Sequence, residues 1–183
     1  MRVGFDVDGV LANFTRAFTK LAVSIGEAPA IVEQEDQREW KFPFHVDRVW
    51  REVARTQNWW MTLDPLIDNF ELDFINELIR TEEAVYFITN RQESDIGLPV
   101  VEQTRLWLRG IGIDTGNVLA VERKGPVCAA LDLDWFIDDK IENLESISHS
   151  GVFAVARSWS YNDEWDGCRV NNLTQLEDLY ERR

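Results

Sequence analysis

The chain has 183 residues, 45% hydrophobic and 28% charged, which is typical of one ordered globular domain or of one domain with a modest insertion. Its formal net charge of −14 repels polyanions and argues against a nucleic-acid polymer or an anionic membrane as the main partner. With no apolar stretch as long as a signal-peptide core or a membrane span, and with only two cysteines, a cytoplasmic protein is expected.

Short apolar segments predict the strands of a sheet, beginning with residues 2–7, which show the little polar alternation expected of a parallel strand covered on both faces. Similar segments follow at residues 84–88, 117–121, 135–137 and 152–156. Helical patterns separate them at residues 99–109, 125–131 and 141–149. A last helix is predicted over residues 174–181, where Thr174 and Glu177 would form a capping box. This alternation predicts an α/β fold with a Rossmann-type parallel sheet and helices on both faces.

Residues 13–80 interrupt the alternation, because they hold helical patterns but no convincing strand. Four apolar residues recur there at the spacing of one helical face, namely Val46, Val49, Trp50 and Val53. On that face Trp50 is expected to be a core residue. We predict a small helical cap over residues 13–80, inserted after the first strand of a core domain formed by residues 1–12 and 81–183.

Asp6 and Asp8 come at the end of the first strand, and Gly9 follows them. The two carboxylates are two residues apart, so they point to the same side at the edge of the sheet where α/β proteins bind ligands. Gly9 has no Cβ, which lets the chain turn and lets backbone amides approach a ligand closely. An Asp-Gly pair alone would indicate only a turn, but two carboxylates between a buried strand and a second apolar segment favour a reactive site.

Three later features complete a pattern. The segment 86–90 is an apolar strand that ends in Thr89, the segment 136–139 is an apolar strand that ends in two aspartates, and Lys124 precedes the helix that leads into the latter. In chain order, these features and the Asp-x-Asp-Gly segment resemble the four signature motifs of the haloacid dehalogenase (HAD) superfamily of phosphohydrolases.

The resemblance implies that Asp6 attacks phosphorus and forms an aspartyl-phosphate, while Asp8 protonates the leaving oxygen and later deprotonates a water molecule. Thr89 would donate to a phosphoryl oxygen, although a threonine at a strand end can also reflect β-propensity alone. Lys124 would bring positive charge to the phosphate and to the aspartate, with a solvated surface lysine as the alternative.

Further phosphate contacts are expected from Gly9, Asn90 and Arg91. Several carboxylates that converge on one site need a cation, and oxygen ligands select Mg²⁺. The resemblance implies that Asp6 and Asp138 bind the ion through their side chains, and that Asp8 binds it through its backbone carbonyl. It implies for Asp139 either a bond through water or an orienting role. Which of Asp138 and Asp139 binds directly stays open.

The substrate is suggested by two segments, residues 6–14 and 59–66, which are similar to the 5′(3′)-deoxyribonucleotidase branch of the superfamily. That branch acts on nucleoside monophosphates and has a small helical cap at the same place. The chain departs from it after the second strand, with Thr-Asn-Arg where the branch usually has Thr-Ser. An extended pair cannot point both side chains into one core, so at least one of Trp59 and Trp60 is expected to face the substrate and stack on its base.

The sequence thus predicts a Mg²⁺-dependent phosphomonoesterase that acts on a small phosphorylated metabolite, with a nucleoside monophosphate as the expected substrate. A sugar phosphate or phosphoglycolate is the alternative substrate. A non-catalytic HAD-fold binding protein is the alternative function. Monomer and homodimer both stay open.

Overall fold

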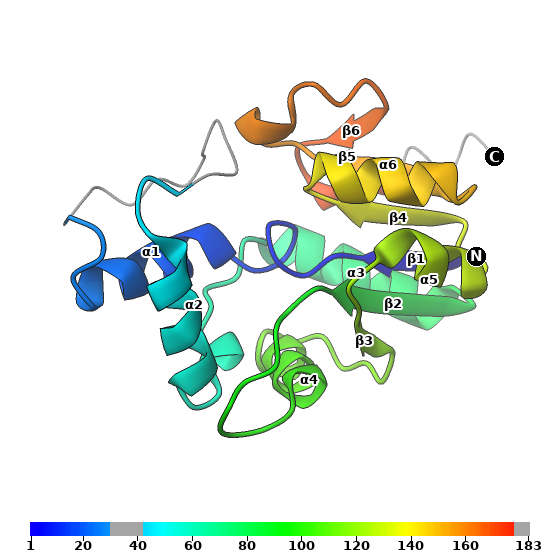
Figure 1. Ribbon diagram of the computed structural model, residues 1–183. Coiled ribbons are helices and arrows are strands. Elements are labelled where there is room, and N and C mark those ends of the chain that lie inside the picture. The colour runs from blue at the N-terminus through cyan, green and yellow to red at the C-terminus, as the bar shows by residue number, and fades with distance from the viewer. Residues whose placement is uncertain (30–41, 178–183) are drawn as a thin grey trace.

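The computed structural model describes residues 1–29 and 42–177 (Figure 1). Residues 30–41 of the expected cap and residues 178–181 of the expected last helix lie outside those ranges. Among the described residues, the helices are all too short or too polar to cross a lipid bilayer.

A six-stranded parallel sheet forms the centre of the molecule (Figure 1). From one edge to the other it consists of β3 (Val118–Ala120), β2 (Ala84–Thr89), β1 (Arg2–Phe5), β4 (Trp135–Asp138), β5 (Phe153–Arg157) and β6 (Cys168–Val170). The first strand in the sequence is central, because Val3 pairs with Val85 on one side and with Trp135 on the other. All strands run parallel, so their carboxyl ends share one edge, and the expected α/β sheet is confirmed.

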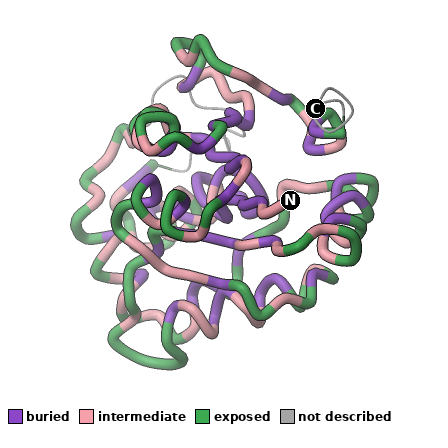
Figure 2. The backbone as a smooth tube through the Cα atoms, turned by 90° about the vertical axis from the view of Figure 1, so that its right-hand side faces the viewer, coloured by how far each residue is buried: buried purple, intermediate pink, exposed green. Residues whose placement is uncertain are grey.

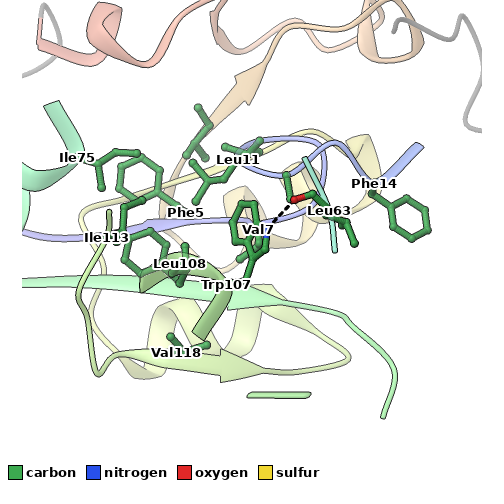
Figure 3. Packing of buried hydrophobic residues seen from close by; sticks show 14 of the residues in the cluster. Phe5, Val7, Leu11, Phe14, Leu63, Ile75, Trp107, Leu108, Ile113 and Val118 are labelled. Atoms are coloured by element: carbon green, nitrogen blue, oxygen red, sulfur yellow. Dashed lines mark hydrogen bonds between the residues drawn. The ribbon is translucent and has the colours of Figure 1, made fainter. Parts of the chain in front are cut away.

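Alternate residues of the strands enter two apolar clusters, one on each face of the sheet. On the first face Phe5 stacks on Phe87 and meets Trp135 edge-on, and Figure 3 shows the surrounding side chains. On the second face Phe136 covers Gly4, where a Cβ would lie 2.4 Å from the ring. Figure 2 shows buried residues toward the centre of the molecule and helices that alternate between buried and exposed residues. Burial on both faces explains why the strands read as nearly continuous apolar runs.

Helices cover both faces of the sheet. On one face α5 (Lys124–Ala130) and α6 (Ile141–His149) pack against each other and the sheet, and on the other α3 (Asn69–Thr81) contacts β2 (Figure 1). A capping box between Asp68 and Glu71 starts α3. The buried Glu71 also pairs with Arg157 at the end of β5, which ties α3 to the sheet.

Two helices lie beyond the carboxyl ends of the strands, namely α1 (Phe14–Ser24) and α2 (Val46–Arg55) (Figure 1). The chain then passes through a single 3-10 turn, η1 (Trp59–Met61), which packs against α4 (Val100–Gly110). The described part of residues 13–80 contributes helices and no sheet strand, as expected. The division into cap and core stays a prediction, and α3 lies against the sheet although it belongs to that range.

Two details differ from the expectations. β6 was not expected, because it is only three residues long and carries a charged residue, Arg169, at its centre. Thr174 does not begin a helix. The side chain of Asn172 accepts a hydrogen bond from the Thr174 amide, and Gln175 completes the capping box of the short 3-10 helix η3 (Leu173–Leu176). Asparagine is as good a cap as threonine, so the box is shifted by two residues.

Candidate active site

Strand ends bring two carboxylates together around one lysine. Asp6 follows β1, Asp138 ends β4 and Lys124 begins α5. The Lys124 Nζ lies 2.7 Å from Asp6 Oδ1 and 2.6 Å from Asp138 Oδ2, and the lysine side chain is only 2% exposed. The alternative of a surface lysine is therefore wrong. The Val7 amide donates to the same Asp6 oxygen at 2.6 Å, which leaves Asp6 Oδ2 without a hydrogen-bond partner in the described part of the chain.

The two acids at the end of β4 differ in their hydrogen bonding. Asp138 is fully engaged, because it also accepts from the Lys140 amide at 2.9 Å and from Asn143 Nδ2 at 3.0 Å. Asp139 Oδ2 accepts from the Tyr161 hydroxyl at 2.5 Å, but its buried Oδ1 has no hydrogen-bond partner among residues 1–29 and 42–177. Carboxylate oxygens of Asp6, Asp138 and Asp139 lie within 4.8 Å of one another. We call Asp6, Lys124, Asp138 and Asp139 the acidic floor.

Burial and mutual repulsion act on the protonation of the acidic floor. Burial raises the pKa of Asp6 to about 7, Lys124 opposes this rise, and Asp138 and Asp8 add to it. Burial also raises the pKa of Asp139 well above its ordinary value, with further increases from Asp138 and Asp6. For Lys124, burial alone would lower the pKa, but the attraction of Asp138 and Asp6 outweighs burial and raises it. The floor therefore carries a permanent cation and more carboxylates than that cation can neutralise.

Asp8 points to a different set of partners. Arg91 donates from Nε to Asp8 Oδ2 and from Nη2 to Asp8 Oδ1, both at 2.9 Å, and Thr89 Oγ1 donates to Oδ2 at 3.2 Å. The Arg91 side chain is completely buried, and its remaining terminal nitrogen donates to Thr104 at 3.1 Å. Arg91 therefore contacts Asp8 and not the space where a phosphate would bind.

Gly9 forms the turn that follows Asp8, and this turn lies against Asp139. Its φ is +83°, a left-handed value that favours glycine, and a Cβ there would lie 2.0 Å from Asp139 Oδ2. The Gly9 amide donates to the Ala12 carbonyl, and its carbonyl accepts from Trp159 Nε1 at 2.7 Å. Gly9 thus lets Asp139 approach the first acidic segment, whereas its amide is already used inside the turn.

A cavity of about 620 Å³ opens above the acidic floor. One side of it is polar, and is lined by Asp6, Asp8, Thr89, Asn90, Gln92, Lys124, Lys140 and Asn143. The other side, which we call the aromatic wall, consists of Phe14, Phe42, Phe44, Trp50 and Trp60. Phe14 lies at its centre, stacked on Trp50 at 5.6 Å and on Trp60 at 6.0 Å between ring centroids. A charged group and a flat apolar group fit side by side in this space.

The adjacent tryptophans take different places. Both are buried, and their rings meet edge-on at 4.9 Å between centroids, because η1 is a 3-10 turn and not the extended segment that we assumed. Trp60 lines the cavity, whereas Trp59 lines a separate surface depression with Lys20 and Asp64. Trp50, expected in the core, is only half-buried and lines the cavity as well.

Of the expected site residues, Asp6, Asp8, Thr89, Asn90, Lys124 and Trp60 line the cavity. Asp138 and Asp139 are completely buried beneath it, and Arg91, Gly9 and Trp59 do not line it either. Sequence reasoning missed Asn143 and Tyr161, which donate to the acids, and Trp159, which donates to the Gly9 carbonyl. The last two follow β5, so the rule that ligands bind beyond strand ends could have indicated them. Asn143 lies in the first turn of α6, where the sequence gives no comparable signal.

Comparisons with known proteins agree with this geometry. The family model described as 5′ nucleotidase, deoxy (pyrimidine), cytosolic type C protein matches residues 1–182. Among curated proteins, none matches the sequence significantly.

Similar solved structures include a HAD-superfamily hydrolase from Ehrlichia chaffeensis, with 14% identity, coverage of 99% of this chain and 96% of that one, and a TM-score of 0.56. A HAD-superfamily hydrolase of subfamily IA from Geobacter sulfurreducens has 16% identity, coverage of 97% and 98%, and a TM-score of 0.58. A protein described as a predicted phosphoglycolate phosphatase from Haemophilus somnus has 13% identity, coverage of 98% and 97%, and a TM-score of 0.60. At identities this low, the structural similarity establishes a shared fold and nothing more specific.

Proposed function

We propose that this chain, which belongs to the 5′ nucleotidase, deoxy (pyrimidine), cytosolic type C family and is a phosphoric monoester hydrolase, is a Mg²⁺-dependent nucleoside monophosphatase of the cytoplasm. The two-sided lining of its cavity carries this proposal. A phosphoryl group needs a nucleophile and positive charge, which the polar side offers in Asp6 and Lys124. A base needs a flat apolar partner, and aromatic stacking contributes ~1–3 kcal/mol per base. A nucleoside monophosphate has both groups within one small molecule.

Mg²⁺ fits the acidic floor. The buried Asp139 Oδ1 has no hydrogen-bond donor among the residues that the structure describes, and oxygens of Asp6 and Asp138 lie within 4.8 Å of an Asp139 oxygen. Buried carboxylates without a counter-charge are costly, and Mg²⁺ prefers such oxygen ligands. Asp6, Asp138 and Asp139 would hold the ion, together with the Asp8 backbone carbonyl. When bound, the ion would neutralise charge on the floor and on the phosphate.

The side chains support a reaction in two steps. Asp6 attacks phosphorus with its unengaged Oδ2, the bond between phosphorus and the ester oxygen breaks, and Asp8 gives that oxygen a proton. A water molecule then attacks the aspartyl-phosphate, Asp8 takes its proton, and inorganic phosphate leaves. Lys124 stabilises the negative charge throughout. Thr89 and Asn90 contact phosphoryl oxygens, for which Thr89 exchanges its hydrogen bond to Asp8 for one to the substrate.

A phosphate-release assay tests this proposal. The purified protein is given nucleoside monophosphates, sugar phosphates and phosphoglycolate, each with Mg²⁺ and with EDTA. We expect the highest kcat/KM for a nucleotide, and no turnover in EDTA. A preference for phosphoglycolate or a sugar phosphate would favour the alternative substrates. Absence of turnover on every ester, together with binding of a phosphorylated ligand, would favour the non-catalytic HAD-fold binding protein.

A further inference from the structure

Arg91 is built into the site more rigidly than a substrate contact requires. Three of its nitrogens are engaged, two by Asp8 and one by Thr104, and Thr104 in turn donates to the Val100 carbonyl at 2.8 Å. Its guanidinium carbon lies 5.0 Å from the Trp60 ring centroid and 5.6 Å from that of Trp107. Two tryptophan rings and three hydrogen bonds thus fix the Arg91 guanidinium against the Asp8 carboxylate.

The rings that hold Arg91 are themselves fixed. Trp107 Nε1 donates to the Leu63 carbonyl at 2.8 Å, the contact drawn in Figure 3, and Trp60 Nε1 donates to the Gln92 carbonyl at 3.0 Å. Trp60 also belongs to the aromatic wall. A planar guanidinium that meets both oxygens of a carboxylate sets the direction of that carboxylate, which a single point charge does not.

We propose that Arg91 is a positioning residue that orients the Asp8 carboxylate toward the leaving-group oxygen. Trp60, which packs on Arg91 and lines the cavity, couples this orientation to the aromatic wall. The inference rests on the proposed function, because it takes Asp8 as the acid and base. Asp8 comes two residues after Asp6, and only a fixed orientation keeps it on the leaving-group side of the phosphorus that Asp6 attacks. Arg91 acts from behind Asp8, since it is buried and does not line the cavity.

The test exploits the fact that a proton donor matters most when the leaving group is poor. Phenyl phosphate and para-nitrophenyl phosphate present similar rings to the aromatic wall, but phenolate is the poorer leaving group. The readout is the ratio of their kcat/KM values, which reports the first chemical step, for wild type, Arg91→Lys and Arg91→Gln. Arg91→Lys keeps the buried positive charge but cannot donate to both Asp8 oxygens in the plane of a guanidinium, so folding is least affected in this variant.

We expect kcat/KM for phenyl phosphate to fall by about 100-fold in Arg91→Gln, as for loss of an aligned general acid, and by less in Arg91→Lys. The loss for para-nitrophenyl phosphate should be at least tenfold smaller, and the Mg²⁺-induced rise in Tm should persist. Thr104→Val, which removes the third hydrogen bond of Arg91 together with the one from Thr104 to the Val100 carbonyl, should shift the ratio in the same direction by a smaller factor.

Equal losses on both esters in Arg91→Lys and Thr104→Val would show a merely structural role and overturn the proposal. A rise in KM with unchanged kcat would overturn it too, because it would make Arg91 a phosphate contact. If wild type hydrolyses neither ester nor any nucleotide, the proposed function itself fails, and that outcome is visible before any variant is made.

Discussion

The acidic floor and the aromatic wall border the same cavity but are held in different ways. Every member of the floor ends or follows a strand, or starts a helix, and directional hydrogen bonds fix it at the sheet edge. The wall comes from α1, α2, η1 and the segment that precedes α2, and mainly ring contacts hold it, although Trp60 also donates to the Gln92 carbonyl. Hydrogen bonds impose one geometry, whereas ring packing tolerates changes of shape. Chemistry should therefore depend on the floor, and substrate choice on the wall.

The largest effect should come from the floor. Asp6→Asn keeps the side-chain volume but removes the nucleophile, so turnover should fall by more than about 10³-fold while the fold is retained. Phosphate release measures the loss, and circular dichroism confirms folding. Activity within tenfold of wild type in a folded variant would contradict the mechanism.

Mg²⁺ binding should depend on the carboxylates of the floor and not on acids elsewhere on the surface. Mg²⁺ at roughly 100 times its Kd should raise the free energy of unfolding by about 2.7 kcal/mol, because it binds only the folded state. Asp139→Asn removes the charge beside the unpartnered oxygen and should abolish most of this gain, which thermal melts with and without Mg²⁺ measure.

The matched control is Asp163→Asn, whose side chain is 73% exposed at the surface. It should keep the full Mg²⁺ response. A wild-type Tm that is unchanged by Mg²⁺ would show that the floor is not a metal site.

The wall should affect selectivity by a smaller amount. Trp50→Leu removes a half-buried ring from the cavity, and should cost ~1–3 kcal/mol in kcat/KM for a nucleotide but much less for a sugar phosphate. Trp59→Leu is the matched control, because Trp59 also contacts Phe14, at 6.1 Å between centroids, without lining the cavity. Equal losses on both substrates in Trp50→Leu would assign the wall a structural role.

The smallest effect should be on stability as a function of pH in the absence of metal. Burial raises the pKa of Asp6 from 3.8 to about 7 and raises that of Asp139 well above its ordinary value. Between the unfolded and folded values the folded state binds more protons. The stability from these groups is therefore complete at pH below about 4 and is lost as pH rises through the folded values.

Thermal melts in EDTA between pH 5 and pH 8 measure this loss. Because Lys124 offsets part of the burial effect, we expect Tm to decrease by only a few degrees, and Asp139→Asn to flatten the curve. A wild-type Tm that rises with pH relative to that of Asp139→Asn would contradict the assignment.

Most of the sheet and floor could be predicted from sequence, because strands buried on both faces read as apolar runs and parallel strands deliver their terminal residues to one edge. That rule accounts for Asp6, Asp8, Thr89 and Asp138. The wall could not be predicted in the same way, since Phe14 and Trp50 meet only through tertiary packing of α1 on α2. The pairing of Arg91 with Asp8 could not be predicted either, because the sequence does not reveal the direction of a long side chain after a strand.

The central position of β1 has a consequence for the order of assembly during synthesis. Residues 2–5 pair with residues 84–87 and 135–137, which leave the ribosome much later than they do. A nascent chain must therefore hold its central strand without its full set of partners until β4 has been made, and such exposed segments are prone to aggregation. A chain that is truncated before residue 135 would retain Asp6 but lack the strand that carries Asp138, so nascent chains should become resistant to protease only after β4 has emerged.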